Sequence, residues 1–191
     1  MKILNLLKSK ALTRLGVREN VHHGHNFHVG PGSVLWAPSR LDIGYNVYVG
    51  KNVTIQVDGS IGDEVLFANG SGVVGRLDHN YLQVGTPVRS AQWVGNTPSL
   101  SSPTTIGSDV WVGFNATIYS GLQIGNSSII AAGSVVTKNV PENSIVAGCP
   151  AKFIRHRYSP DQFEKHWKQL EEKNVRRIKL TEELTFGVEN S

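Results

Sequence analysis

The stretch Ile106–Val136, which reads IGSDVWVGFNATIYSGLQIGNSSIIAAGSVV, holds the pattern that decides the fold. Every sixth residue in it is apolar, and an earlier stretch, Ile43–Val73, keeps the same step. The twelve residues at these positions are Ile43, Val49, Ile55, Ile61, Phe67, Val73, Ile106, Val112, Ile118, Ile124, Ile130 and Val136. Because 39% of the chain is hydrophobic, twelve hits in twelve would arise by chance at about 10⁻⁵, so the period reports structure.

The two stretches also match each other at a fixed offset, which aligns Ile43 with Ile106 and gives 14 identities in 31 positions. A six-residue period inside an eighteen-residue period is expected for a prism-shaped parallel β-helix. Each six is then a short strand plus a corner, and three sixes close one coil. The apolar residues point inward and stack on the next coil, while Gly and Asn at the corners tolerate positive φ. We therefore predict an all-β solenoid.

An extruded loop is predicted at residues 76–102. The offset between the two stretches contains more residues than the two coils that would separate matching faces. The six-residue step also stops in this segment. Loops of this length in compact domains are usually functional or disordered, and the aromatic residues in this one favour function. His79 is the candidate general base, since imidazole titrates near neutral pH. The alternative is a loop histidine without a chemical task. Asn80, Tyr81 and Trp93 are candidate substrate contacts.

The 191 residues are expected to form one domain with appendages. We predict an N-terminal helix and lead-in at residues 1–20, the β-helix with its loop at 21–157, and a C-terminal helical extension at 158–191. In the extension, Ser159 can cap a helix that reaches Lys173. The N-terminal helix is expected to cover the end of the solenoid, with weak attachment to an anionic membrane surface as the alternative.

Bulk composition narrows the function class. The net charge of +4 and the pI near 9.3 favour an anionic ligand over a nucleic-acid groove. A single cysteine, Cys149, excludes an internal disulfide framework and fits a reducing compartment. No apolar run approaches the ~20 residues of a membrane span, and early basic residues argue against a signal peptide. We expect a cytoplasmic protein.

Four histidines lie close together at the start of the predicted solenoid: His22, His23, His25 and His28. Imidazole is a common metal ligand, so a metal site is one interpretation. Strand alternation, however, divides the four between two sides, and no acidic or cysteine partner lies nearby. Structural or surface roles are therefore favoured over substrate contacts and metal binding, and no metal is expected.

Residues 137–158, TKNVPENSIVAGCPAKFIRHRY, add more specific motifs. Together with IGSDVWVGFNATI and IIAAGSVVTKNVP, they resemble the hexapeptide-repeat acyltransferase family of left-handed β-helix enzymes. That family includes serine, galactoside and maltose O-acetyltransferases, xenobiotic and streptogramin acetyltransferases, and enzymes that acetylate capsular or lipopolysaccharide sugars. The resemblance extends from Val29 to about Arg157. Two departures are Cys149, where members have Asn, and a loop longer than in the galactoside and maltose enzymes.

The resemblance implies a left-handed β-helix, a homotrimer, and acetyl-CoA bound in a groove between two subunits, with His79 as the loop base. It also implies acetyl-CoA contacts at Gly113, Phe114, Ala132, Thr137, Lys138, Lys152 and Arg155. Lys and Arg suit the phosphates of CoA because they supply charge-assisted hydrogen bonds, and solvated rim charges are the alternative for these side chains.

The reaction implied by the resemblance is transfer of an acetyl group from acetyl-CoA to a sugar hydroxyl, without a nucleic-acid partner. An antibiotic hydroxyl and an amino-sugar nitrogen are the alternative acceptors. A zinc hydratase on the same solenoid would need three converging histidines, which the spacing does not show. A non-catalytic scaffold would not bind CoA.

Overall fold

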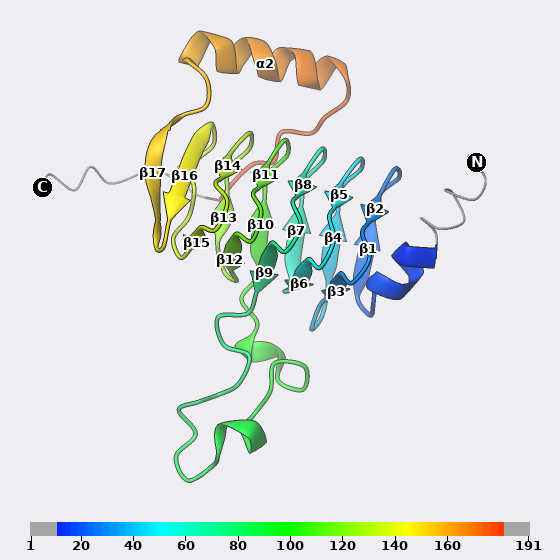
Figure 1. Ribbon diagram of the computed structural model, residues 1–191, viewed down its shortest axis with the longest axis vertical. Helices are drawn as coiled ribbons and strands as arrows, with labels where there is room; N and C mark the ends of the chain where they lie inside the picture. The colour runs from blue at the N-terminus through cyan, green and yellow to red at the C-terminus, as the bar shows by residue number, and fades with distance from the viewer. Residues whose placement is uncertain (1–10, 182–191) are drawn as a thin grey trace, which may run out of the picture.

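The computed structural model describes residues 11–181, which form a three-sided parallel β-helix (Figure 1). The first sheet contains β1 (Val21–His23), β4 (Leu41–Ile43), β7 (Gly59–Ile61), β10 (Thr104–Ile106) and β13 (Gln123–Ile124). The second contains β2 (His28–Val29), β5 (Tyr48–Val49), β8 (Leu66–Phe67), β11 (Trp111–Val112), β14 (Ile129–Ile130), β16 (Ser144–Gly148) and β17 (Ala151–His156). The third contains β3 (Val34–Trp36), β6 (Thr54–Gln56), β9 (Gly72–Val74), β12 (Thr117–Tyr119) and β15 (Val135–Val136).

From β1 to β15 successive strands belong to the first, second and third sheets in turn, so each of these coils contributes one strand to each side. The twelve apolar residues of the repeat all point inward and are at most 6% exposed. They form one continuous core, because each coil stacks its apolar side chains on those of the next. The predicted left-handed parallel β-helix is confirmed. β16 and β17 pair antiparallel and end the second sheet.

Strand register confirms that a long segment is inserted between two coils. Leu41 pairs with Gly59 on the next coil, and Thr105 pairs with Gln123, so both steps equal one ordinary coil. Gly59, in contrast, pairs with Thr104, and the chain between these two partners contains the predicted loop as well as one coil. The loop leaves the solenoid between β9 and β10 as a separate lobe, drawn in green below the coils in Figure 1. It contains two short 3₁₀ helices, η1 (Val88–Ser90) and η2 (Pro98–Leu100).

Asparagine occupies left-handed positions at several corners, as the sequence predicts. Asn26, Asn46, Asn52, Asn115 and Asn143 all have φ between 52° and 58°. Asn tolerates this conformation better than most residues because its short side chain can hydrogen-bond locally. Corners of this kind let the chain turn sharply from one sheet to the next.

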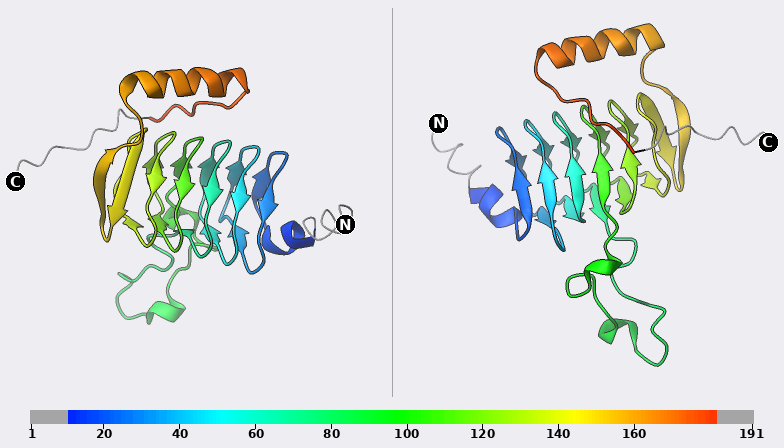
Figure 2. Two further views of the ribbon diagram at one scale, coloured as in Figure 1. Left: turned by 45° about the horizontal axis from the view of Figure 1, so that its top comes forward. Right: turned by 180° about the vertical axis from the view of Figure 1, so that it is seen from behind.

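The C-terminal helix α2 (Pro160–Glu172) begins as predicted. The Ser159 hydroxyl accepts a hydrogen bond from the Gln162 N–H, and the Gln162 side chain accepts one from the Ser159 N–H, which completes a capping box. Phe163 and Trp167 are buried against Val175 and the partly buried Tyr45. Figures 1 and 2 show that α2 and the loop lie on opposite sides of the solenoid.

Residues 173–181 turn back from α2 and run along the coils. At the opposite end, residues 11–16 are helical and Val17 pairs with Leu35 of β3. The greater part of the predicted N-terminal helix lies outside the described residues. Between residues 11 and 181, none of the helices has the length and apolar character needed to cross a membrane.

Candidate active site

Three of the predicted acetyl-CoA contacts meet at one corner of the solenoid, where the second sheet gives way to the third. Gly113 and Phe114 follow β11, and Ala132 follows β14 on the next coil. The Gly113 N–H donates to the Ile130 carbonyl at 2.8 Å, and the Gly133 N–H donates to the Phe114 carbonyl at 2.8 Å. A Cβ on Gly113 would lie 2.6 Å from the Ala132 nitrogen, so only glycine allows the coils to approach this closely.

Lys152 and Arg155 lie on β17, toward opposite ends of that strand. Lys152 pairs with Ala147 and Arg155 pairs with Ile145. The turn before Lys152 sits over the same corner as Ala132, because the Gly148 N–H donates to the Ser134 hydroxyl at 3.2 Å. Lys152 follows this turn, two residues beyond Pro150, while the Arg155 guanidinium donates to the His156 carbonyl at 3.0 Å.

Thr137 and Lys138 lie on the other edge of the third sheet, directly after β15. The loop leaves the solenoid along this edge, and its first residue, Arg76, donates from its guanidinium to the Thr137 carbonyl at 3.1 Å. The Arg76 backbone N–H also donates to the Ser120 hydroxyl at 2.9 Å. Sequence analysis did not identify Arg76, although a basic residue at the first position of the insertion was a possible signal.

His79 is held by a short antiparallel ladder within the loop. It pairs with Trp93, the Asn80 N–H donates to the Gln92 carbonyl at 2.9 Å, and the Val94 N–H donates to the Asp78 carbonyl at 2.9 Å. The Nδ1 atom of His79 is buried and has no hydrogen-bond partner in the part of the chain that the structure describes. The ladder therefore fixes the backbone at His79, and one of the two imidazole nitrogens is enclosed.

The three candidate substrate contacts occupy different environments. The Asn80 amide donates to the Gln92 side chain at 3.0 Å, so it holds the loop together. Tyr81 is 63% exposed, whereas the Trp93 ring lies parallel to that of Trp36, with centroids 5.6 Å apart and an interplanar angle of 4°. Of the three, Trp93 is the one that faces the solenoid.

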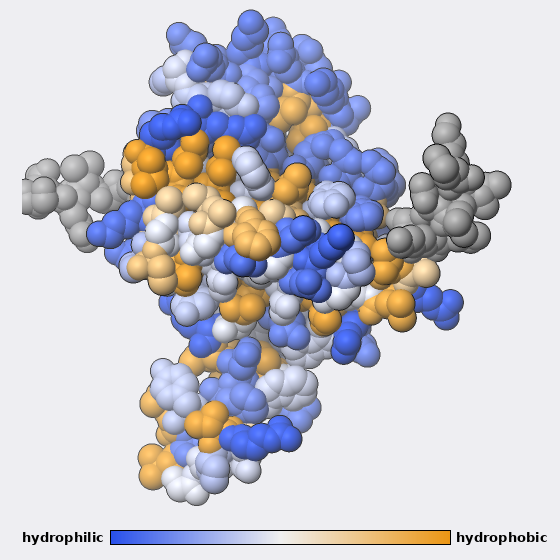
Figure 3. Space-filling view, viewed as in Figure 1, coloured by the Kyte–Doolittle hydropathy of each residue, from blue (hydrophilic) through white to orange (hydrophobic). Residues whose placement is uncertain are grey.

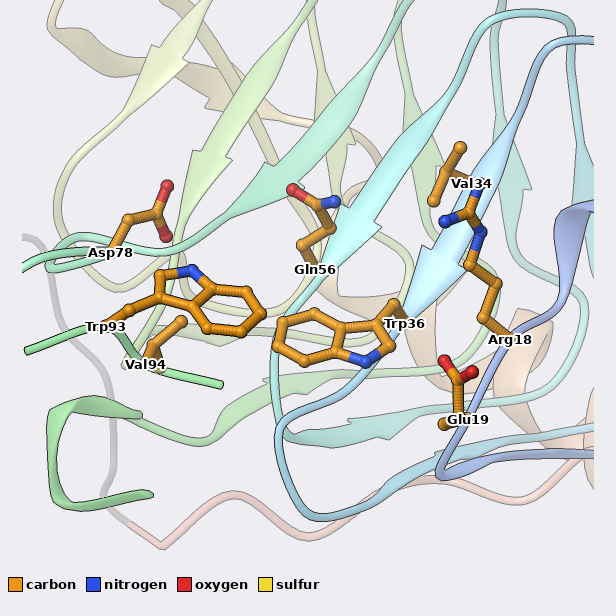
Figure 4. Close-up of a pocket in the computed structure, with 8 residues that line it drawn as sticks. All are labelled: Arg18, Glu19, Val34, Trp36, Gln56, Asp78, Trp93 and Val94. Atoms are coloured by element: carbon orange, nitrogen blue, oxygen red, sulfur yellow. The ribbon is translucent and has the colours of Figure 1, made fainter. Parts of the chain in front are cut away.

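A cavity of about 330 Å³ lies where the loop faces the first two coils (Figure 4). Its lining residues come from the segment before β1, from β3, from β6 and from the loop: Arg18, Glu19, Val34, Trp36, Gln56, Asp78, Trp93 and Val94. Sequence analysis identified only Trp93 among them. The six-residue pattern shows that Trp36 and Gln56 point outward from their strands, but it does not show what packs against them.

Three of the four histidines near the first coil stack on aromatic rings. His23 stacks on Phe27, His25 on Tyr45 and His28 on Tyr48, with centroids 4.4 to 5.0 Å apart. Across residues 11–181, no group of three or more His, Cys, Asp or Glu side chains is arranged to hold a metal ion.

Comparison with known proteins identifies several relatives. Residues 103–138 match the family "bacterial transferase hexapeptide (six repeats)". The galactoside O-acetyltransferase of Escherichia coli (strain K12) is 38% identical over 136 residues, which are 69% of this chain and 62% of that protein. A putative lipopolysaccharide biosynthesis O-acetyl transferase of the same strain is 34% identical over 143 residues, 71% of each chain.

A solved galactoside acetyltransferase in complex with coenzyme A has a similar structure. Its TM-score is 0.61 and its sequence identity 30%, covering 82% of this chain and 74% of that one. This chain spans about three-fifths of the length of the curated galactoside relative.

Proposed function

Since the chain belongs to the hexapeptide-repeat acetyltransferase family, we propose that it transfers the acetyl group of acetyl-CoA to a hydroxyl of a sugar. The observation that carries this proposal is the arrangement around the third sheet. One edge carries the closely stacked corner of Gly113, Phe114 and Ala132, and the loop with His79 is attached along the other edge. The solved relative with coenzyme A and the two relatives named for sugar acetylation support the same reaction.

Acetyl-CoA would lie along the corner of Gly113 and Ala132, where Ala132 is exposed and its short side chain lets a ligand approach the backbone. Phe114 is 56% exposed beside this corner and offers apolar surface to the pantetheine arm. Thr137 and Lys138 would lie along the pantetheine and phosphates, and Lys152 and Arg155 would bind the phosphates through charge-assisted hydrogen bonds.

In the proposed reaction, His79 accepts the proton of the sugar hydroxyl while that oxygen attacks the thioester carbonyl. Because Nδ1 is enclosed, Nε2 is the atom that accepts the proton. Backbone N–H groups that line the groove would stabilise the oxyanion of the tetrahedral intermediate. The intermediate then expels the CoA thiolate, which receives the proton from His79. No covalent enzyme intermediate is needed, so Cys149 has no part in the reaction.

We also propose that the protein is a cytoplasmic homotrimer with its acetyl-CoA groove between subunits. Exposed apolar side chains on the solenoid support an assembly. Tyr48, Leu66 and Trp111 form a column along the second sheet and are 41% to 50% exposed. Figure 3 shows apolar surface on the loop as well as on the solenoid. Sedimentation equilibrium of the purified protein tests the trimer, and a monomer would exclude it.

Calorimetric titration with CoA and acetyl-CoA tests the donor. We expect micromolar binding by the wild type and at least tenfold weaker binding by the double variant Lys152→Ala/Arg155→Ala. The matched control is Lys165→Ala/Lys168→Ala, which removes the same charge from α2 and should bind normally. Absence of CoA binding by the wild type would exclude the proposed donor and leave the scaffold interpretation.

A further inference from the structure

The cavity between the loop and the first two coils, here called the Trp36–Trp93 cavity, has a flat apolar wall. Its two indole rings are parallel, and they come from segments far apart in the sequence (Figure 4). Trp93 remains 42% exposed although it contacts Trp36. The volume of about 330 Å³ lies within the range of small-molecule sites.

Four polar side chains around this wall form no side-chain hydrogen bond or ion pair within residues 11–181. They are Arg18, Glu19, Gln56 and Asp78, which line the cavity. The Asp58 carboxylate on the neighbouring coils, in contrast, accepts hydrogen bonds from the Ser39 and Arg40 N–H groups at 2.7 and 2.8 Å. The cavity therefore combines an apolar wall with unused donors and acceptors, as binding sites for small polar molecules do.

The cavity also lies beside the candidate base. His79 and Trp93 are direct partners across the antiparallel ladder. Their side chains therefore project from the same face, with Cβ atoms about 5 Å apart. His79 itself does not line the cavity. A molecule that rests on Trp93 would thus place a neighbouring group near the imidazole.

We propose that the Trp36–Trp93 cavity binds a neutral pyranose ring of the acceptor and determines which sugars are acetylated. A pyranose has a face of C–H groups that packs on indole rings and a rim of hydroxyls that hydrogen-bond. Arg18 and Gln56 supply donors, and Glu19 and Asp78 supply acceptors. Two carboxylates against one guanidinium disfavour an acidic sugar, because like charges repel. The inference rests on the proposed function for the role of the sugar as acceptor.

Binding without acetyl-CoA tests the subsite. The probes are methyl β-D-galactopyranoside, methyl α-D-glucopyranoside and the acidic methyl β-D-glucuronide, titrated against the full chain and followed by NMR. We expect millimolar binding of at least one neutral probe, weaker binding of the glucuronide, and at least tenfold loss in Trp36→Ala. The matched control Val88→Ala removes an exposed apolar side chain from η1, outside the cavity, and should bind as the wild type does. No binding of either neutral probe, or equal binding by Trp36→Ala, would overturn the proposal.

A second variant separates binding from loop displacement, since Trp36 also packs against the loop. Gln56 is exposed and lines the cavity, so Gln56→Ala should keep the wild-type melting temperature and weaken sugar binding about threefold or more. Unchanged binding by this variant would remove Gln56 from the subsite and contradict the assignment of the rim.

Kinetics distinguish failure of the subsite from failure of the proposed function. In a transfer assay, Trp36→Ala should raise KM for the sugar and leave KM for acetyl-CoA unchanged. If the wild type binds neutral pyranosides but transfers no acetyl group, the proposed function is contradicted and the proposed sugar subsite is not. A wild-type enzyme that transfers acetyl, with an unchanged KM for the sugar in Trp36→Ala, refutes the subsite alone.

Discussion

Asp63 and Arg176, 113 positions apart in the sequence, form an ion pair that fastens the C-terminal segment to the solenoid. The Asp63 carboxylate is fully buried at a corner, and the Arg176 guanidinium donates to both of its oxygens, at 2.6 and 2.8 Å. Burial alone would raise the pKa of Asp63, but hydrogen bonds from the Arg176 side chain and backbone and from the Tyr45 N–H outweigh it, so the pKa lies below its usual value.

Replacement Arg176→Gln is expected to lower the free energy of unfolding by about 1–2 kcal/mol at neutral pH. The cost stays modest because the Arg176 side chain is 64% exposed and solvent screens the lost charge. Urea denaturation measures it. Arg40→Gln is the matched control, because its partner Asp42 is exposed, and we expect less than about 0.5 kcal/mol there. Equal losses of unfolding free energy in the two variants would contradict a stabilising role for the Asp63–Arg176 ion pair.

The contribution of the Asp63–Arg176 pair should depend on pH in a defined direction. Since the pKa of Asp63 is lower in the folded state than its unfolded value of about 3.9, the contribution is complete above that value and is lost as pH falls through the folded pKa. The stability difference between wild type and Arg176→Gln should therefore be constant from about pH 5 to 7 and shrink below about pH 4. A difference that grows on acidification would contradict the assignment.

Deletion of residues 76–102 should leave the solenoid folded. Removing this segment restores the six-residue step between Val73 and Ile106, so β9 and β10 are joined by an ordinary corner. The loop has few buried apolar side chains of its own; Ala91 and Val94 are the buried ones. We expect a circular dichroism spectrum of β type, retained CoA binding and no acetyl transfer. A protein that fails to fold would show that the loop is part of the core.

Gly113→Ala should destabilise the fold more than Gly85→Ala. The added methyl group on residue 113 would meet backbone atoms of Ala132 and Ile130 at 2.6 and 2.7 Å, and neither can move without separating two coils. We expect a loss of about 2–3 kcal/mol, as for other overpacked sites. Gly85 has φ of +79° with open space around it, so alanine there costs only about 1 kcal/mol of backbone strain. Thermal denaturation of both variants measures the difference, and an equal effect would contradict the tight corner.

The sequence was sufficient for the solenoid because each coil repeats one local rule. The inward residue of each six, such as Ile55 or Ile118, appears in the pattern, and the position of the inserted loop follows from the offset between the two stretches. Corner residues such as Asn52 and Asn115 were predictable for the same reason.

The attachment of residues 174–181 to the solenoid and the Trp36–Trp93 cavity both depend on contacts that no local pattern contains. Residues 174–181 have no periodicity, and their positions follow from acceptors such as Asp63 and Asn126 that coil stacking brings into line. Trp36 is recognisable as an outward residue of a strand, but its partner Trp93 is set by the path of the loop. These two sets of contacts were therefore not predictable from one sequence.

The most direct test of the proposed reaction is the rate of acetyl transfer from acetyl-CoA to a neutral sugar by wild type and His79→Ala, with CoA affinity measured on the same preparations. General-base catalysis typically contributes ~10²–10⁴-fold, so the variant should lose that much turnover and keep its fold and CoA affinity. His22→Ala, an exposed histidine on β1, is the matched control and should retain full activity. Near-normal turnover by His79→Ala would contradict the assignment of the base.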